Sequence, residues 1–146
     1  MNKELKQTSQ DELDELISSG KKDLSNLNLS GLEFKTASSW GGITGATLKN
    51  FNFQNSNLTD SNFTECELIQ VNFKRATLIG AWFIQALCKN VNFEGALLNQ
   101  TYFSSTEFID IDFKKVDVTE AWFRGAFFKN SDLSQAINLD KAINSD

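Results

Sequence analysis

Few residues in this 146-residue chain could take part in catalysis or bind a metal ion. The sequence has no histidine and only two cysteines, Cys66 and Cys88. It therefore lacks the most common general base, and no serine or cysteine can pair with one. Two cysteines without histidine do not make an ordinary zinc site, and a calcium ion needs six or more converging oxygens. We expect no catalytic residue, no metal ion and no cofactor.

Glycines near residue 42 suggest a phosphate-binding loop, but the following residues do not fit one. Gly41, Gly42 and Gly45 lie close together in the sequence. A phosphate-binding loop of the P-loop type requires lysine and then serine or threonine after its last glycine. Gly45 is followed instead by Ala46 and Thr47. We interpret this stretch as a bulge or small loop.

Three large aromatic residues recur at intervals of twenty residues: Trp82, Tyr102 and Trp122. Tryptophan and tyrosine are enriched at interface hot spots, and a contiguous exposed apolar patch usually marks an interaction surface. We predict that these three residues bind a partner, with Leu97, Phe127 and Arg124 at the margins. The alternative is that the rings only stiffen the structure, and a platform for a sugar or another ligand is a third possibility.

A five-residue period indicates how these side chains are positioned. From Ile43 to Leu133 every fifth residue is apolar, except Cys88. This period matches neither a helix nor a strand, whose patterns repeat near 3.6 and 2 residues. It fits a short extended side followed by a corner. In such a side the residue two before the apolar one faces inward with it, and the residue directly before faces outward.

A slower period of twenty residues indicates four sides to each turn of the coil. Phenylalanine recurs at Phe53, Phe73, Phe93 and Phe113, and again at Phe63, Phe83, Phe103 and Phe123. Like residues should then stack from one coil to the next, about 4.8 Å apart. Trp82, Tyr102 and Trp122 each precede one of these phenylalanines and should point outward. Cys66 and Cys88 should face inward as free, unreactive thiols. They lie one coil apart, so a disulfide bridge between them is the alternative.

Individual five-residue units resemble the A(D/N)LxX repeat of the pentapeptide repeat family. Examples are residues 56–60 (SNLTD), 61–65 (SNFTE) and 131–135 (SDLSQ), and the resemblance covers roughly residues 22–137. It implies an all-β fold, a right-handed quadrilateral β-helix of about five coils with a core of leucine and phenylalanine. The chain departs from the family pattern at the outward position, where apolar residues replace asparagine or aspartate. These residues are Trp82, Leu87, Leu97, Tyr102, Trp122 and Phe127.

Three segments fall outside the regular repeat. Within residues 1–21, residues 1–8 should form a polar, frayed tail, followed by a short α-helix at about 10–19 that begins with a capping box at Ser9 and Glu12. This helix should cover the first coil, and recruitment of a partner by its apolar face is the alternative. The phase of the β-helix, predicted for residues 22–137, breaks at 35–42. Residues 138–146 form a C-terminal tail, and Ala136, Leu139 and Ala142 could cover the last coil.

Composition and the resemblance together limit the function. No apolar run is long enough to span a membrane, no leader is evident, and two cysteines suit a reducing compartment. We expect a bacterial, cytoplasmic protein that is not an enzyme. Its role should be that of a rigid protein-binding or scaffold module, with an unidentified protein or a second copy as partner. We expect neither direct nucleic-acid binding nor membrane binding, and a small-molecule ligand is not favoured.

The resemblance also implies an alternative function, because some members of the family mimic DNA and inhibit type II topoisomerases in quinolone resistance. Such a modulator of DNA gyrase needs an acidic surface. Residues 46–133 contain ten acidic and eight basic residues, a net charge of −2. One series reads Lys49, Ile69, Lys89, Ile109 and Lys129, which does not suit a DNA mimic. We therefore rank gyrase modulation second.

Overall fold

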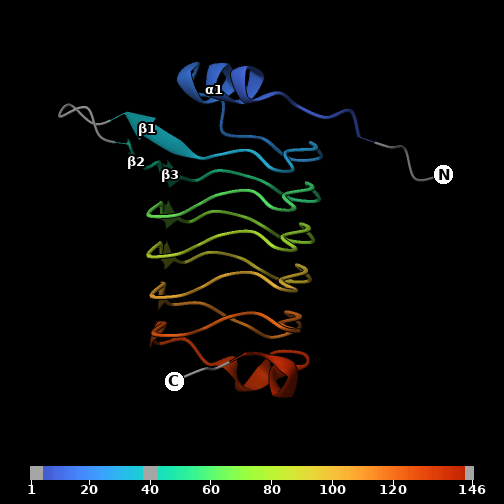
Figure 1. Ribbon diagram of the computed structural model, residues 1–146, viewed down its shortest axis with the longest axis vertical. Helices are drawn as coiled ribbons and strands as arrows, with labels where there is room; N and C mark the ends of the chain where they lie inside the picture. The colour runs from blue at the N-terminus through green and yellow to red at the C-terminus, as the bar shows by residue number, and fades with distance from the viewer. Residues whose placement is uncertain (1–4, 38–42, 144–146) are drawn as a thin grey trace.

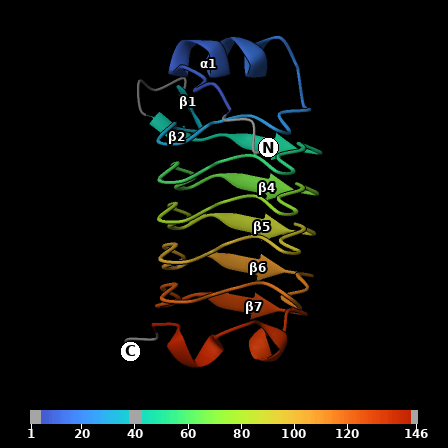
Figure 2. The ribbon, with the colours of Figure 1, turned by 90° about the vertical axis from the view of Figure 1, so that its right-hand side faces the viewer.

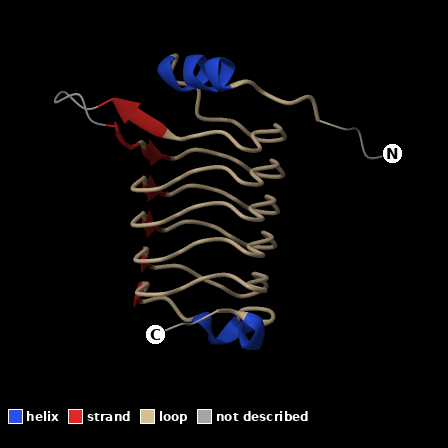
Figure 3. Cartoon of the chain, in the orientation of Figure 1, coloured by secondary structure: helices blue, strands red, loops and turns tan. Residues whose placement is uncertain are grey.

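The chain forms a parallel β-solenoid whose stacked coils lie between a helix at one end and short 3-10 helices at the other (Figures 1 and 3). This computed structural model describes residues 5–37 and 43–143. The helix is α1 (Gln10–Ser18), and the strands are β1 (Lys35–Ala37), β2 (Ile43–Gly45), β3 (Thr47–Lys49), β4 (Glu67–Ile69), β5 (Leu87–Lys89), β6 (Glu107–Ile109) and β7 (Phe127–Lys129). The 3-10 helices span Leu133–Gln135 and Leu139–Lys141. None of the helices in the described ranges is long and apolar enough to cross a membrane.

Residues that stack on one another are twenty positions apart in the sequence. Strands β3 to β7 form one parallel sheet in the order of the chain (Figure 2). The strands are in register, so that Leu68 pairs with Cys88. The other sides pair through single bridges at the same interval, as in Asn72–Asn92, Thr77–Leu97 and Tyr102–Trp122. The predicted four-sided repeat is therefore confirmed. Going along the chain, we call the four sides the asparagine side (Asn72), the Leu97 side, the aromatic side (Tyr102) and the sheet side (β3–β7).

From Leu48 to Phe123 the central residue of every five-residue unit is buried, as predicted, and Phe128 and Leu133 near the C-terminal end are partly buried. Phe73, Phe83, Phe93 and Phe103 are fully buried. Equivalent rings of successive coils stack, with centroids 4.9 Å apart for Phe63 and Phe83 and 5.2 Å for Phe53 and Phe73. Rings of the asparagine side meet those of the opposite aromatic side edge to face, as Phe73 meets Phe83. Both arrangements are favourable for aromatic pairs, so the core is one continuous column of rings.

The corners require an unusual backbone conformation. On three of the four sides, the residue that opens the next unit donates its N–H to the carbonyl of the central residue, as from Ala76 to Phe73 at 2.9 Å. The residue before it lies in the left-handed region, with φ of 56° at Arg75 and 63° at Lys115. Residues other than glycine and asparagine are disfavoured there. The corner therefore stores strain that the core packing and the ladder of hydrogen bonds must offset.

The break in phase is an antiparallel hairpin and not a simple bulge. Strand β1 pairs with β2, with Lys35 opposite Gly45, and the hairpin projects from the first coil (Figure 1). Residues 38–42 of the predicted break at 35–42 lie outside the described residues. Ile43, which we assigned to the series of central residues, lies in β2 because the regular coils resume only after the hairpin. Across the hairpin, stacked residues such as Asn28 and Asn57 are twenty-nine positions apart.

Both ends of the solenoid are covered by the chain itself. The predicted capping box at Ser9 and Glu12 is present at the start of α1, and Leu13 of this helix is fully buried. We expected residues 1–8 to be frayed. Residues 1–4 lie outside the described residues, but Gln7 pairs with Asn28 because the segment before α1 adds to the free edge of the first coil. At the other end, pairing with the preceding coil continues to Ile143, which bridges to Trp122. Ala136, Leu139 and Ala142 pack against the core, as expected for a cover.

Candidate functional site

The aromatic side presents three rings in a column, which we call the aromatic ladder: Trp82, Tyr102 and Trp122. Their backbones pair directly from coil to coil. The ring centroids of Trp82 and Tyr102 are 5.9 Å apart in an edge-to-face arrangement, and those of Tyr102 and Trp122 are 6.2 Å apart and nearly parallel. Trp82 is 47% exposed and Tyr102 37%, while Trp122 is half-buried. The structure thus brings the three predicted residues together on the outside of the solenoid.

The predicted margins lie on neighbouring sides of the same surface. Leu97 is 41% exposed on the Leu97 side, and Phe127 is 58% exposed at the start of β7 on the sheet side. Arg124 is exposed at the corner that follows Trp122. Sequence reasoning missed Ile137, which is 47% exposed and belongs to the same column as Leu97. The signal was weak because the five-residue pattern fades beyond Leu133.

The aromatic ladder replaces residues that elsewhere hold the corner in place. At the outward position on the asparagine side, Asn72, Asn92 and Asp112 each accept a hydrogen bond from the backbone N–H two residues later, at 2.8–2.9 Å. Asn62 accepts the equivalent bond on the aromatic side, one coil before Trp82. A tryptophan or tyrosine cannot accept in this geometry. Within the described ranges, the N–H groups of Ile84, Ser104 and Arg124 have no such side-chain partner.

The two cysteines are buried and free. The Cys66 thiol donates to the carbonyl oxygen of Phe34 at 3.0 Å. Burial raises the pKa of the Cys66 thiol to about 12, and burial also raises the pKa of Cys88. Since the thiolate is the reactive form, neither residue is a nucleophile at neutral pH.

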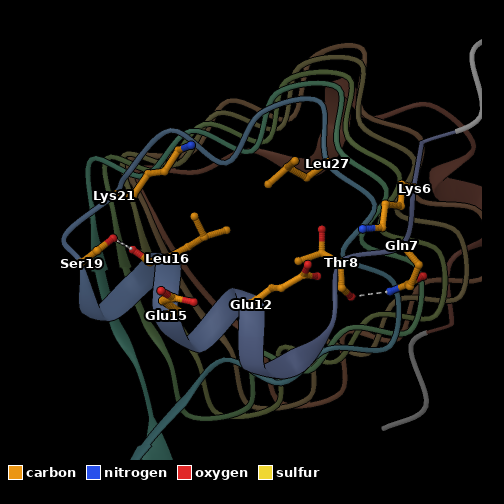
Figure 4. Close-up of a pocket in the computed structure, with 9 residues that line it drawn as sticks. All are labelled: Lys6, Gln7, Thr8, Glu12, Glu15, Leu16, Ser19, Lys21 and Leu27. Carbon is orange, nitrogen blue, oxygen red and sulfur yellow. Dashed lines mark hydrogen bonds between the residues drawn. The ribbon is translucent and has the colours of Figure 1, made fainter.

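A hollow of about 490 Å³ lies between α1, the N-terminal segment and the first coil (Figure 4). Sequence reasoning missed it because it depends on where the end segments cross the coil. The residues that line it are Lys6, Gln7, Thr8, Glu12, Glu15, Leu16, Ser19, Lys21 and Leu27. Two of its polar groups serve local structure: the Glu12 carboxylate accepts the Ser9 N–H, and the Ser19 hydroxyl donates to the Leu16 carbonyl. No nucleophile paired with a base lies among the lining residues.

The carboxylates are spread over the surface and do not converge. Asp112 and Asp132 stack on the asparagine side, as the twenty-residue period requires. Each accepts the N–H of the second residue after it, and the hydrogen bonds from the Ser134 N–H and hydroxyl lower the pKa of Asp132. In residues 5–37 and 43–143, no three metal-ligating side chains come together. These carboxylates therefore act on the backbone of their own corners.

Comparison with known proteins agrees with the repeat pattern. A family model described as a pentapeptide repeat region matches residues 56–142. A pentapeptide repeat protein from the thylakoid lumen of Arabidopsis thaliana shares 28% identity over 68% of this chain and 70% of its own, with a TM-score of 0.50. A search of curated proteins found no match.

Two further solved structures have lower TM-scores. QnrB1, a plasmid-mediated fluoroquinolone resistance protein, has 23% identity over 84% of this chain and 62% of its own, with a TM-score of 0.34. HetL from the cyanobacterium Nostoc sp. strain PCC 7120, a protein involved in regulating heterocyst differentiation, has 20% identity over 85% of this chain and 66% of its own, with a TM-score of 0.38. Both similarities are too weak to support an inference about function.

Proposed function

Because this chain belongs to the pentapeptide repeat family, we propose that it is a rigid, non-enzymatic protein-binding module with the aromatic ladder as its main contact surface. Leu97, Phe127 and Arg124 extend this surface on either side of the ladder, and Ile137 continues it toward the C-terminal end. Two buried free thiols suit a reducing compartment such as the cytoplasm.

The observation that carries the proposal is the loss of corner hydrogen bonds beneath the ladder. Asparagine or aspartate at the outward position accepts a hydrogen bond from a backbone N–H that Trp82, Tyr102 and Trp122 leave without a side-chain partner. The rings also expose apolar area that asparagine would not. A sequence selected for stability alone would favour the family residue at these places. An exposed aromatic column on a rigid scaffold instead suits binding, because few side-chain torsions need to be ordered.

The chemistry of the surface argues against an enzyme. The side chains around the ladder are aromatic, aliphatic, singly charged or neutral hydroxyls and amides, and the sequence contains no histidine that could act as their base. The thiols that could act as nucleophiles lie in the core. The exposed aromatic and aliphatic side chains of this surface suit a binding role.

The test replaces each ring of the ladder by asparagine, the residue that holds the corner at Asn62, Asn72 and Asn92. The variant Trp82→Asn/Tyr102→Asn/Trp122→Asn should fold but lose association with the partner. A matched control, Lys49→Ser/Lys89→Ser/Lys129→Ser, changes three exposed residues on three coils of the sheet side. This control should still associate with the partner. Co-purification from the native host with quantitative mass spectrometry, together with sedimentation of each purified variant, measures both kinds of association. A ladder variant that folds and retains every association of the wild type would show that the rings do not bind.

A further inference from the structure

The charged residues of the solenoid separate into an acidic and a basic half around its axis. We define the acidic half, within residues 46–133, as the aromatic side, its two flanking corners, and the outward positions of the Leu97 side and the sheet side. It holds six acidic residues and one basic residue, Arg124. The six are Asp60, Glu65, Glu67, Glu107, Asp117 and Glu120.

The remaining surface, which we call the basic half, holds seven basic and four acidic residues. The basic residues are Lys49, Lys74, Arg75, Lys89, Lys114, Lys115 and Lys129, and the acidic ones are Glu94, Asp110, Asp112 and Asp132. The net charges of the two halves are therefore −5 and +3. The aromatic ladder runs along the middle of the acidic half.

Five of the six carboxylates beside the ladder are on exposed residues and available to a partner. The sixth, Asp117, is half-buried and accepts hydrogen bonds from Thr119 and Asn138. Within the described ranges, none of the six forms an ion pair with the chain itself, whereas Glu94 of the basic half binds Lys74 at 3.1 Å. Glu120 accepts a hydrogen bond from the Gln100 side chain at 2.8 Å, which keeps its charge at the corner beside the ladder.

The backbone of the aromatic side cannot pair with an added strand. The N–H groups of the outward and central residues of each unit already bond to the coils above and below, as from Tyr102 N–H to the Ala81 carbonyl and from Phe103 N–H to the Trp122 carbonyl. The ends of the solenoid, where strand edges would be open, are covered by α1 and by the C-terminal 3-10 helices. A partner must therefore recognise side chains and not complete a sheet.

A second copy of the chain is a poor occupant of this surface. A two-fold dimer would place the same patch on both chains against itself, so the carboxylates would face carboxylates. A head-to-tail contact would pair the acidic half with the basic half of the next copy. The middle of that basic half is the polar asparagine side, which offers Asn72, Asn92 and Asp112 to the rings.

We infer that the aromatic ladder and its acidic flanks bind a cationic amphipathic helix of another protein. Apolar residues on successive turns of an α-helix are about 5.4 Å apart, close to the 4.8 Å spacing of the coils. Over three rungs the mismatch is only about 1 Å, so one apolar side chain could meet each ring. Lysines and arginines beside the apolar stripe of the helix would then lie over the carboxylates. This inference rests on the proposed function and adds the class of partner.

The probe is a fluorescein-labelled helical peptide of about 14 residues with leucines in one stripe and lysines on both flanks. Its counterpart carries glutamates in place of the lysines. Fluorescence anisotropy measures the dissociation constant of each peptide for the wild type and for three variants. The charge variant is Glu65→Gln/Glu107→Gln/Glu120→Gln. The second variant, Glu94→Gln/Asp110→Asn/Asp112→Asn, is its control and makes the same change in net charge on the basic half. The third variant is the ladder variant Trp82→Asn/Tyr102→Asn/Trp122→Asn.

We expect the cationic peptide to bind the wild type and the control more tightly than the anionic peptide does. The charge variant should bind it about tenfold more weakly, since three surface ion pairs are lost. The ladder variant, which keeps all six carboxylates, should lose the binding. Equal weakening in the charge variant and its control, equal binding of both peptides, or no binding of the cationic peptide would overturn the inference.

The outcomes separate this inference from the proposed function. A wild type that self-associates in sedimentation, with a ladder variant that does not, would identify a second copy as the partner. That result upholds the ladder as a binding surface and rejects the cationic helix. A ladder variant that binds the cationic peptide as tightly as the wild type would show that charge alone attracts the peptide, and the inference would fail.

Discussion

Phe93 contacts its equivalents in the coils before and after it, as well as rings on the opposite side of the solenoid. Phe93 stacks between Phe73 and Phe113, with centroids 5.5 Å and 6.4 Å away, and meets Phe83 and Phe103 edge to face. A residue in this position therefore couples several coils at once. In a solenoid, each repeat is stabilised only by its neighbours.

Replacing Phe93 by alanine should destabilise the protein by about 3–5 kcal/mol, as for other large-to-small changes in a packed core. The site cannot collapse easily because the backbones of adjacent coils are held at a fixed spacing. Urea denaturation followed by circular dichroism measures the change. Lys89→Ala, an exposed change one unit earlier on β5, is the control. Equal midpoints for the two variants would contradict the inward position of Phe93.

Gly45 lies where two segments of the backbone approach each other closely. The chain returns from the hairpin at this residue and passes directly against the next coil. A Cβ atom on Gly45 would overlap the backbone of Glu65 and Cys66. Those backbone atoms cannot move aside as a flexible side chain could. The close approach explains a glycine here without any bound phosphate.

Gly45→Ala should therefore lower the free energy of unfolding by more than about 1 kcal/mol, because the native backbone does not tolerate the added atom. Thr47→Ala, an exposed change two residues later, should have little effect. Thermal denaturation of the two variants beside the wild type tests this. If Gly45→Ala unfolds at the same temperature as the wild type, the hairpin can shift without loss of stability and the close contact is not a constraint.

At the scale of one side of the solenoid, the outward residue of each unit either accepts a hydrogen bond from the corner backbone or exposes an apolar side chain to a partner. Asn92 accepts a hydrogen bond from the Glu94 N–H at its corner, whereas Tyr102 on the aromatic side exposes a ring and leaves the Ser104 N–H without a side-chain partner. Both residues occupy the same place in the five-residue unit. Exchanging one type for the other should alter binding more than folding.

The ladder variant Trp82→Asn/Tyr102→Asn/Trp122→Asn should accordingly unfold at a midpoint close to that of the wild type or above it. Each asparagine gains a hydrogen bond worth about 0.5–1.5 kcal/mol, which offsets the lost ring contacts of similar size. Chemical denaturation measures the balance. Asn92→Ala, which loses a corner bond and gains nothing, should be less stable than the wild type. A ladder variant that unfolds far earlier would favour the alternative that the rings stiffen the structure.

The sequence predicted the repeating elements well because each is specified by the same local pattern. The four sides, the inward phenylalanines and the outward ladder all follow from periods of five and twenty residues. The hairpin was harder to predict, since pairing of Lys35 with Gly45 depends on a segment outside the repeat. Pairing of Gln7 with Asn28 was missed for the same reason. The left-handed corners carry little signal, because residues as ordinary as Arg75 and Lys115 occupy them.

At the scale of the whole molecule, net charge is a poor guide to what a solenoid binds. The value of −2 for residues 46–133 conceals two halves of opposite sign. The twenty-residue period already assigns each charged residue to a side, so the separation could have been read from the sequence. The sequence does not decide whether the ladder binds a partner, because exposed rings on a regular scaffold serve binding and stiffness through the same contacts.

The charge separation also bears on the alternative function, mimicry of DNA toward DNA gyrase. Duplex DNA carries about one negative charge per 1.7 Å of its axis. The acidic half carries a net −5 over four turns, or about one charge per 4 Å at the usual strand spacing. Its carboxylates flank an apolar column, and the opposite half is basic. We therefore predict that the protein does not inhibit gyrase supercoiling at micromolar concentration. A supercoiling assay over a concentration series tests this, with the charge variant Glu65→Gln/Glu107→Gln/Glu120→Gln as control. Inhibition by the wild type that disappears in this variant would establish the acidic half as a DNA mimic and place gyrase modulation ahead of helix binding.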